Sequence, residues 1–310
     1  MGTSLSTSKP LLTNLHEAAF TYPAIDNHAH PLLRAKHRSD LPFEGLISEA
    51  EGSALTVDAP HTLACHRATR QLTDLFGLPE GSTWENIKAK RFEFEYADLC
   101  RLSFGPTGIQ CILIDDGLGI RDIMHDVSWH DQFTHSPSKR VVRIEVVAEE
   151  ILVELFALLG NSPSTEELAA TMALFMVKLE NSLKASAKDT IVVAFKSVVC
   201  YRSGLAVSPP AVGQEAKSQE DAELLAAFER VYKAHLGSSK IRLQDKALND
   251  SVVRLALEVS AESGKPSEPK PNLIALLCYW YRDTNQFNFT LVSVIIVSRS
   301  RYPRPRIYSP

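Results

Sequence analysis

Residues 23–33 of the chain read PAIDNHAHPLL, a short apolar segment that ends in one aspartate and two histidines. Residues two apart in an extended segment point to the same side, so His28 and His30 can offer two imidazole nitrogens to one point. Neutral imidazole binds zinc and other divalent metals, and Asp26 could orient one of these ligands. Because polar residues also follow many strands as plain loop residues, the position of this pair in the fold decides its interpretation.

Three later segments repeat this arrangement of an apolar strand followed by polar side chains. They are TGIQCILIDDGL at 107–118, RVVRIEVV at 140–147 and TIVVAFKSVVCYRSGL at 190–205. The polar groups are, in chain order, Asp115 and Asp116, then Arg143 and Glu145, then Lys196 and Arg202. The chain therefore places ionisable side chains near the carboxyl end of each predicted strand.

Apolar residues at helical spacing separate these strands. Single helices are expected at 11–20, 148–159, 164–185, 218–236 and 245–263, with the main loop at 207–219. An insertion after the first strand adds helices at 59–78, closed by Leu78-Pro79, and at 83–99, with Ser82 as the expected N-cap. Strands that alternate with helices in this way indicate right-handed βαβ units, an α/β fold and a parallel sheet. In such sheets, functional side chains gather at the carboxyl ends of the strands.

The composition excludes several classes of partner. The chain has 310 residues, of which 45% are hydrophobic and 23% charged, as in an ordinary globular protein. Its formal net charge of -4 provides no positive field, so neither nucleic acid nor a membrane is an expected partner. No secretory signal is recognisable, and no apolar run approaches the ~18 residues that a membrane span needs, so a cytoplasmic location is expected.

The cysteine pattern agrees with a reducing compartment. The five cysteines are an odd number, widely spaced and without a C-x-x-C pair. Such a pattern is typical of reduced thiols in the core of a cytosolic protein. The predicted core thiols are Cys65, Cys100, Cys111, Cys200 and Cys278.

Five motifs in order resemble a known family. They are AIDNHAHPLL, ILIDDGL, RIE, AFKSVVCYRSGL and LALEVSAESGKP, and the similarity runs from about residue 15 to Pro266. Together they resemble the amidohydrolase domain that forms the N-terminal half of fungal FluG-type proteins. This domain, also called amidohydrolase-related, is a metal-dependent hydrolase domain. In that family a glutamine-synthetase-like domain follows, and no such domain is expected in this chain.

The resemblance implies a (β/α)8 barrel of the TIM type with a divalent metal, zinc being expected, at its mouth. It also implies that His28 and His30 are metal ligands and that the substrate is a small molecule. In the wider superfamily the metal activates a water molecule, which attacks a C–N or related bond, or it assists decarboxylation. With only four predicted strands, this chain would form a partial barrel.

The other polar residues at strand ends have two interpretations each. Some superfamily members use a carbamylated lysine to bridge two metals at the place of Lys196, but this lysine could instead pair with Glu145 or with a substrate carboxylate. Arg143 and Arg202 could bind an anion or form salt bridges that brace the barrel ends. Asp26 and Asp115 complete the candidates for metal or substrate binding.

The remaining histidines do not suggest a second metal site. A helix would splay residues five apart around its axis, so a joint metal site is not expected for His125, His130 and His135. The same reasoning applies to His61 and His66.

The resemblance ends at Pro266. No histidine follows His235, so a metal ligand from a fifth strand is missing, and so is the aspartate that the superfamily uses as proton shuttle on a later strand. Two hypotheses follow. The chain is either part of a metal-dependent hydrolase, inactive in this form, or a non-catalytic fragment or regulatory remnant that binds a protein partner.

Residues 267–310 can be interpreted as an unspliced intron followed by the next exon in the wrong frame. Codons AGT for Ser267 and GAG for Glu268 would contain a splice donor, and CAG for Gln286 an acceptor. Removing the intervening bases permits the chain to read SGKPIQLHTGLGDN, which restores a strand followed by a histidine. The alternative is a genuine divergent C-terminus, with NLIALLCYWY and FTLVSVIIVS as added strands or a helix.

Overall fold

The computed structural model describes residues 14–17, 21–263, 275–282 and 289–297. The chain divides into two compact units. Unit 1 comprises Met1–Ile114 and Leu118–Ser138, and unit 2 comprises Asp115–Gly117 and Lys139–Pro310. Each unit is described by itself below.

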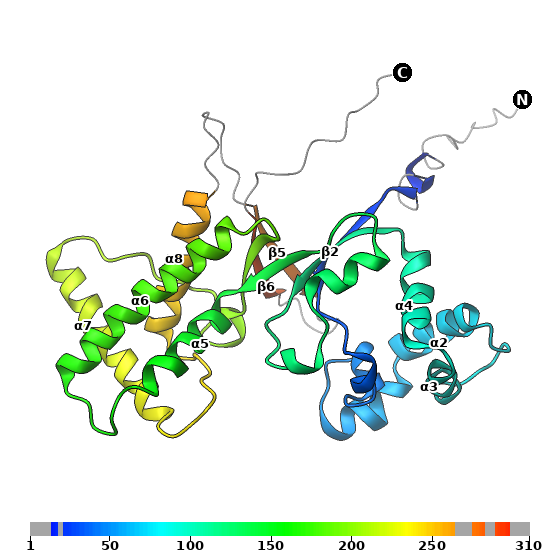
Figure 1. The fold of residues 1–310 in the computed structure, drawn as a ribbon, viewed down its shortest axis with the longest axis horizontal. Helices are drawn as coiled ribbons and strands as arrows, with labels where there is room; N and C mark the ends of the chain where they lie inside the picture. Colours follow the sequence, from blue (N-terminus) through cyan, green and yellow to red (C-terminus); the bar gives the residue numbers. More distant parts are fainter. Residues whose placement is uncertain (1–13, 18–20, 264–274, 283–288, 298–310) are drawn as a thin grey trace, which may run out of the picture. The chain divides into compact units, whose positions relative to one another are not determined.

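Unit 1 contains the first two parallel strands and the predicted insertion. Strand β1 (Ala24–Ala29) pairs in parallel with β2 (Ile109–Asp115). The register shifts between Asp26 and Ala29, so the strand is irregular where the two histidines begin. Between these strands lie α2 (Leu63–Phe76), α3 (Trp84–Glu93) and α4 (Tyr96–Phe104), which appear in cyan in Figure 1.

The insertion has a small core and several short turns of helix. Its buried side chains are Cys65, Phe76, Trp84, Ile87 and Leu99. The short turns are 3-10 helices η1 (Ala35–His37), η2 (Phe43–Leu46) and η4 (Ala59–His61), and the π-helical turn η3 (Ala54–Asp58). Helix α2 ends before Gly77, which takes the left-handed conformation with φ 65° that glycine adopts without strain. The predicted closure at Leu78-Pro79 was therefore two residues late.

The predicted cap and extent of the second inserted helix were wrong. Thr83, not Ser82, caps α3, because its side chain accepts from the backbone N–H of Asn86 while the Asn86 side chain accepts from that of Thr83. The Ser82 hydroxyl instead donates to the carbonyl of Pro79. The predicted single helix is two helices, since Glu95 caps α4 through the N–H of Ala97.

Unit 2 contains the other parallel pair. Strand β3 (Lys139–Arg143) pairs in parallel with β4 (Val192–Ser197), and this register sets Arg143 opposite Lys196. The strand predicted at 140–147 ends at Arg143 because α5 (Ile144–Phe156) begins at once. The apolar residues of α5 follow helical spacing, and the buried ones are Ile144, Ala148, Ile151, Leu152 and Leu155.

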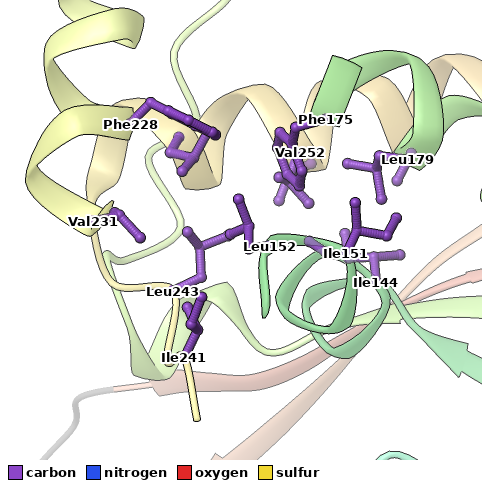
Figure 2. Packing of buried hydrophobic residues seen from close by; sticks show 14 of the residues in the cluster. Ile144, Ile151, Leu152, Phe175, Leu179, Phe228, Val231, Ile241, Leu243 and Val252 are labelled. Atoms are coloured by element: carbon purple, nitrogen blue, oxygen red, sulfur yellow. The ribbon is translucent and has the colours of Figure 1, made fainter. Parts of the chain in front are cut away.

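Three longer helices complete this unit and pack with α5 around its core. They are α6 (Thr165–Lys188), α7 (Gln214–Ala234) and α8 (Lys246–Ser263), and they agree with the predicted helices to within about four residues. Figure 2 shows the core, in which Leu152 of α5, Phe175 of α6, Phe228 of α7 and Val252 of α8 lie together and are fully buried. Burial of such side chains is the main favourable term that holds the unit together.

The tail forms two strands where it is described. Strand β5 (Ala275–Arg282) and β6 (Phe289–Val297) pair antiparallel, and β6 also pairs antiparallel with β4, with Ser197 opposite Val294. On the side of β4 away from β3, a barrel would have a further parallel strand, whereas the described residues place the antiparallel β6 there. The predicted helix at 11–20 lies partly outside these residues.

The structure partly confirms the prediction for the thiols. Cys65, Cys100 and Cys111 are buried and form no disulfide, but Cys200 is only half-buried, because it follows the end of β4. The side chain of Cys278 lies outside the described residues. Within the described part of the chain, no helix is long and apolar enough to cross a membrane.

Candidate functional site

The exit of β1 brings the two predicted metal ligands together. The rings of His28 and His30 have centroids 5.8 Å apart and planes at 71°, an edge-to-face arrangement. His28 is exposed and His30 is half-buried. The Asp26 carboxylate accepts a hydrogen bond of 3.1 Å from the backbone N–H of His28. Asp26 therefore fixes the backbone that carries the histidines.

The spacing of the rings fits two ligands of one metal ion. Metal–nitrogen bonds of about 2.0–2.1 Å at a tetrahedral angle would set the two ring centroids roughly 5 Å apart, close to the observed 5.8 Å. A catalytic zinc generally has three protein ligands. No group of three or more His, Cys, Asp or Glu side chains that could hold a metal occurs among the described residues. His28 and His30 are thus a pair of possible ligands, one fewer than a catalytic zinc generally has.

The backbone directly after His28 and His30 is held by the segment that carries His125 and His130. The backbone N–H of Leu32 donates to Nε2 of His130 over 3.0 Å, and the Leu32 carbonyl accepts from the N–H of His125 over 2.9 Å. Leu33 forms a bridge with Met124. His130 is 1% exposed, and burial lowers the pKa of its ring. In the sequence, the five-residue spacing of His125 and His130 argued only against a joint metal site. It did not indicate that His130 would contact Leu32.

A separate cluster of buried charges lies at the ends of strands in unit 2. Asp115 is 2% exposed, and its Oδ2 accepts from Lys196 Nζ at 3.0 Å and from Arg143 Nη2 at 2.5 Å. Its Oδ1 accepts from the N–H of Gly117 at 2.9 Å. A side chain at Gly117 would not fit, since a Cβ there would lie 2.9 Å from the Cβ of Arg143.

The pKa shifts in this cluster follow from burial and from the shared carboxylate. Burial alone would raise the pKa of Asp115, but the hydrogen bonds and charge of Arg143, with the charge of Lys196, outweigh it and hold that pKa below its usual value. Burial lowers the pKa of Lys196, although Asp115 opposes this shift. Lys196 was expected to pair with Glu145 or with a substrate carboxylate, or to bridge metals, and in the structure it forms an ion pair with Asp115.

Glu145 lies beside this cluster in the first turn of α5. Its Oε1 accepts from the hydroxyl of Ser197 at 2.5 Å and from the N–H of Val198 at 2.9 Å. Its Oε2 is buried without a hydrogen-bond partner in the described part of the chain. Burial raises the pKa of Glu145, against the hydrogen bond from Ser197. The side chain is therefore suited to carry a proton inside the unit.

Two further ion pairs brace the same unit. Arg202 pairs with Glu149 and also donates to the carbonyl of Leu243 at 3.2 Å. Arg140 pairs with Asp116 at 3.0 Å. Arg143 and Arg202 each form a salt bridge, so an anion would have to compete with a carboxylate for either side chain.

The chain matches no profile of a known protein family. It is 35% identical over 269 residues to the protein FluG of Emericella nidulans, and the match covers 83% of this chain and 30% of FluG. The chain therefore spans less than a third of the length of this relative. The homology agrees with the family resemblance of the five sequence motifs.

The fold is similar to that of a solved structure. A hypothetical metal-dependent hydrolase from Lactobacillus casei superimposes with a TM-score of 0.57 and 22% sequence identity, over 81% of this chain and 58% of that one. This likeness confirms the fold class predicted from the sequence, an α/β fold with part of a TIM-type barrel.

Proposed function

We propose that the chain carries the first part of a metal-dependent hydrolase barrel of the amidohydrolase type, with His28 and His30 as two ligands of a divalent metal, zinc in the first instance. The observation that supports this most is the pair of rings 5.8 Å apart directly after the first strand, in a chain homologous to FluG. A bound metal of this kind would activate water for attack on a C–N or related bond of a small-molecule substrate.

The other residues of the chain would support this site. Asp26 fixes the backbone at His28. Lys196 and Arg143 are both engaged by Asp115, so they hold the strand ends in place, and the proposal assigns the metal to the histidines. With two protein ligands, metal affinity should be weak and hydrolysis by this chain undetectable. Neither nucleic acid nor a membrane is a proposed partner.

A zinc titration of the full chain tests the proposal. We expect the ring signals of His28 and His30 to shift together in an NMR titration with Zn²⁺ alone, with an affinity too weak to survive dialysis. Replacing both by alanine (H28A/H30A) should abolish the saturable shift. The matched control is H61A/H66A, because His61 and His66 are two exposed histidines of the same unit.

Two results would contradict the proposal. Zinc binding that persists unchanged in H28A/H30A would place the metal elsewhere. Metal-dependent turnover of an amide by the wild-type chain would refute its inactivity. If the histidines do not respond to zinc, the alternative of a non-catalytic chain that binds a protein partner is favoured.

We also propose that the hydrolase-like part ends at Pro266 and that residues 267–310 come from a retained intron and a shifted frame. The support is the restored reading SGKPIQLHTGLGDN, which would return a histidine after a fifth strand. Sequencing the transcript is the test, and the expected dominant message lacks the segment between Ser267 and Gln286. A dominant message that retains it would overturn this part of the proposal.

A further inference from the structure

We infer that His130 is a positioning residue for His28 and His30, which it holds in place through the backbone of Leu32. This inference rests on the proposed function, because it concerns the alignment of the same two ligands. His130 itself is assigned no contact with the metal.

The hydrogen bonds of His130 define its tautomer. Nδ1 lies 3.0 Å from the carbonyl oxygen of Asp126 and 3.2 Å from that of Val127. Because carbonyl oxygens only accept, Nδ1 carries the proton, and Nε2 is left with the lone pair that accepts from Leu32 N–H. The ring is almost completely buried, so water does not readily replace it as the acceptor.

The position of Leu32 matters because β1 is irregular at the histidines. The register of β1 with β2 shifts between Asp26 and Ala29. Regular backbone hydrogen bonds between the two strands therefore do not hold the segment that carries the histidines. Asp26 holds the stretch on its N-terminal side through the N–H of His28. On its C-terminal side, His130 holds Leu32, and only Pro31 lies between Leu32 and His30.

Proline makes this short connection stiff. The ring of Pro31 fixes its own φ angle and also restricts the backbone of His30, the residue before it. A shift of Leu32 therefore moves His30 and cannot be absorbed by free rotation in between. Supporting groups around metal ligands are known to change metal affinity about 10–100-fold when they are removed.

Two substitutions test the two nitrogens of the His130 ring one at a time. Glutamine can place an acceptor near the position of Nε2 and so keep the bond to Leu32, whereas asparagine reaches only the region of Nδ1. We therefore compare H130Q with H130N in the full chain, with Zn²⁺ alone as the probe and the ring signals of His28 and His30 as the readout.

The chain provides a matched control in unit 2. Nδ1 of His235 lies 2.9 Å from the carbonyl oxygen of Val231, and its Nε2 accepts from the N–H of Arg242 at 3.3 Å. This histidine is thus bonded as His130 is, but it holds a different loop. H235N and H235Q should bind zinc as the wild type does.

The expected result is a zinc affinity about tenfold weaker in H130N and within about twofold of the wild type in H130Q. Equal affinities in H130N and H130Q would overturn the inference. If H130N does not fold, the zinc affinity of H130Q is compared with that of the wild type. An affinity about tenfold weaker in H130Q would overturn the inference. If the wild-type signals of His28 and His30 do not respond to zinc, the proposed function itself fails, and the inference fails with it.

Discussion

The two groups of candidate residues differ in burial and in how their polar atoms are used. His28 is exposed and His30 is half-buried, and the backbone around them is held by hydrogen bonds to Asp26 and His130. In unit 2, by contrast, Asp115 and Lys196 are almost fully buried and are bonded to each other. A ligand site needs access from solvent, whereas a buried ion pair resists any exchange of partners. The first group is therefore suited to binding and the second to holding the strand ends.

The largest expected effect comes from removing the central carboxylate of the buried group. D115N leaves the cations of Arg143 and Lys196 buried without their counter-ion, so we expect a loss of about 3–5 kcal/mol in the free energy of unfolding at pH 7. Urea unfolding measures it. D116N is the matched control, because the pair of Asp116 with Arg140 is partly exposed and should be worth about 0–1 kcal/mol.

Similar unfolding midpoints for D115N and D116N would contradict a structural role of the buried charges. The buried cluster would then not be structural, and its cations would again be candidates for binding an anion. A further check is D115L/K196M, which removes the Asp115 carboxylate and the Lys196 cation together and leaves the more exposed Arg143 in place. This variant should recover part of the loss, since paired apolar replacements avoid an unpaired buried charge.

A smaller effect is expected from Glu145, and its sign depends on pH. Burial raises the pKa of this carboxyl, so between the unfolded and folded pKa values the unfolded state ionises while the folded state stays protonated. The contribution to stability is therefore complete below the unfolded pKa and is lost as pH rises through the folded pKa. E145Q, which keeps an acceptor for Ser197, should be more stable than the wild type at pH 8, with the gain shrinking towards pH 4.

Urea unfolding at pH 4, 6 and 8 measures how the stability gain of E145Q depends on pH. The control is E166Q, because Glu166 is exposed in the first turn of α6 and its replacement should leave the pH dependence of unfolding as in the wild type. A gain in E145Q that is the same at all three pH values would contradict a protonated Glu145.

The sequence by itself determined the features that depend on local pattern. Alternating apolar strands and amphipathic helices predicted the α/β class, and the i, i+2 spacing of His28 and His30 predicted that their rings would lie together. Both signals lie within a few neighbouring residues, because side-chain direction in a strand or helix follows from backbone geometry. Local signals also predicted most of the helices of unit 2, whereas in unit 1 the N-cap of α3 is Thr83, one residue after the predicted Ser82.

The contacts between polar groups far apart in the chain became clear from the folded structure alone. Lys196 could have paired with Glu145 or Asp115, and the choice depends on how strand ends and turns bring their atoms together. The same holds for His130, which meets Leu32 across 98 positions in the sequence. Hydrogen bonds and ion pairs act over a few ångströms and depend on angle, so their partners are set by strand register and loop packing, which a periodic pattern of residues does not encode.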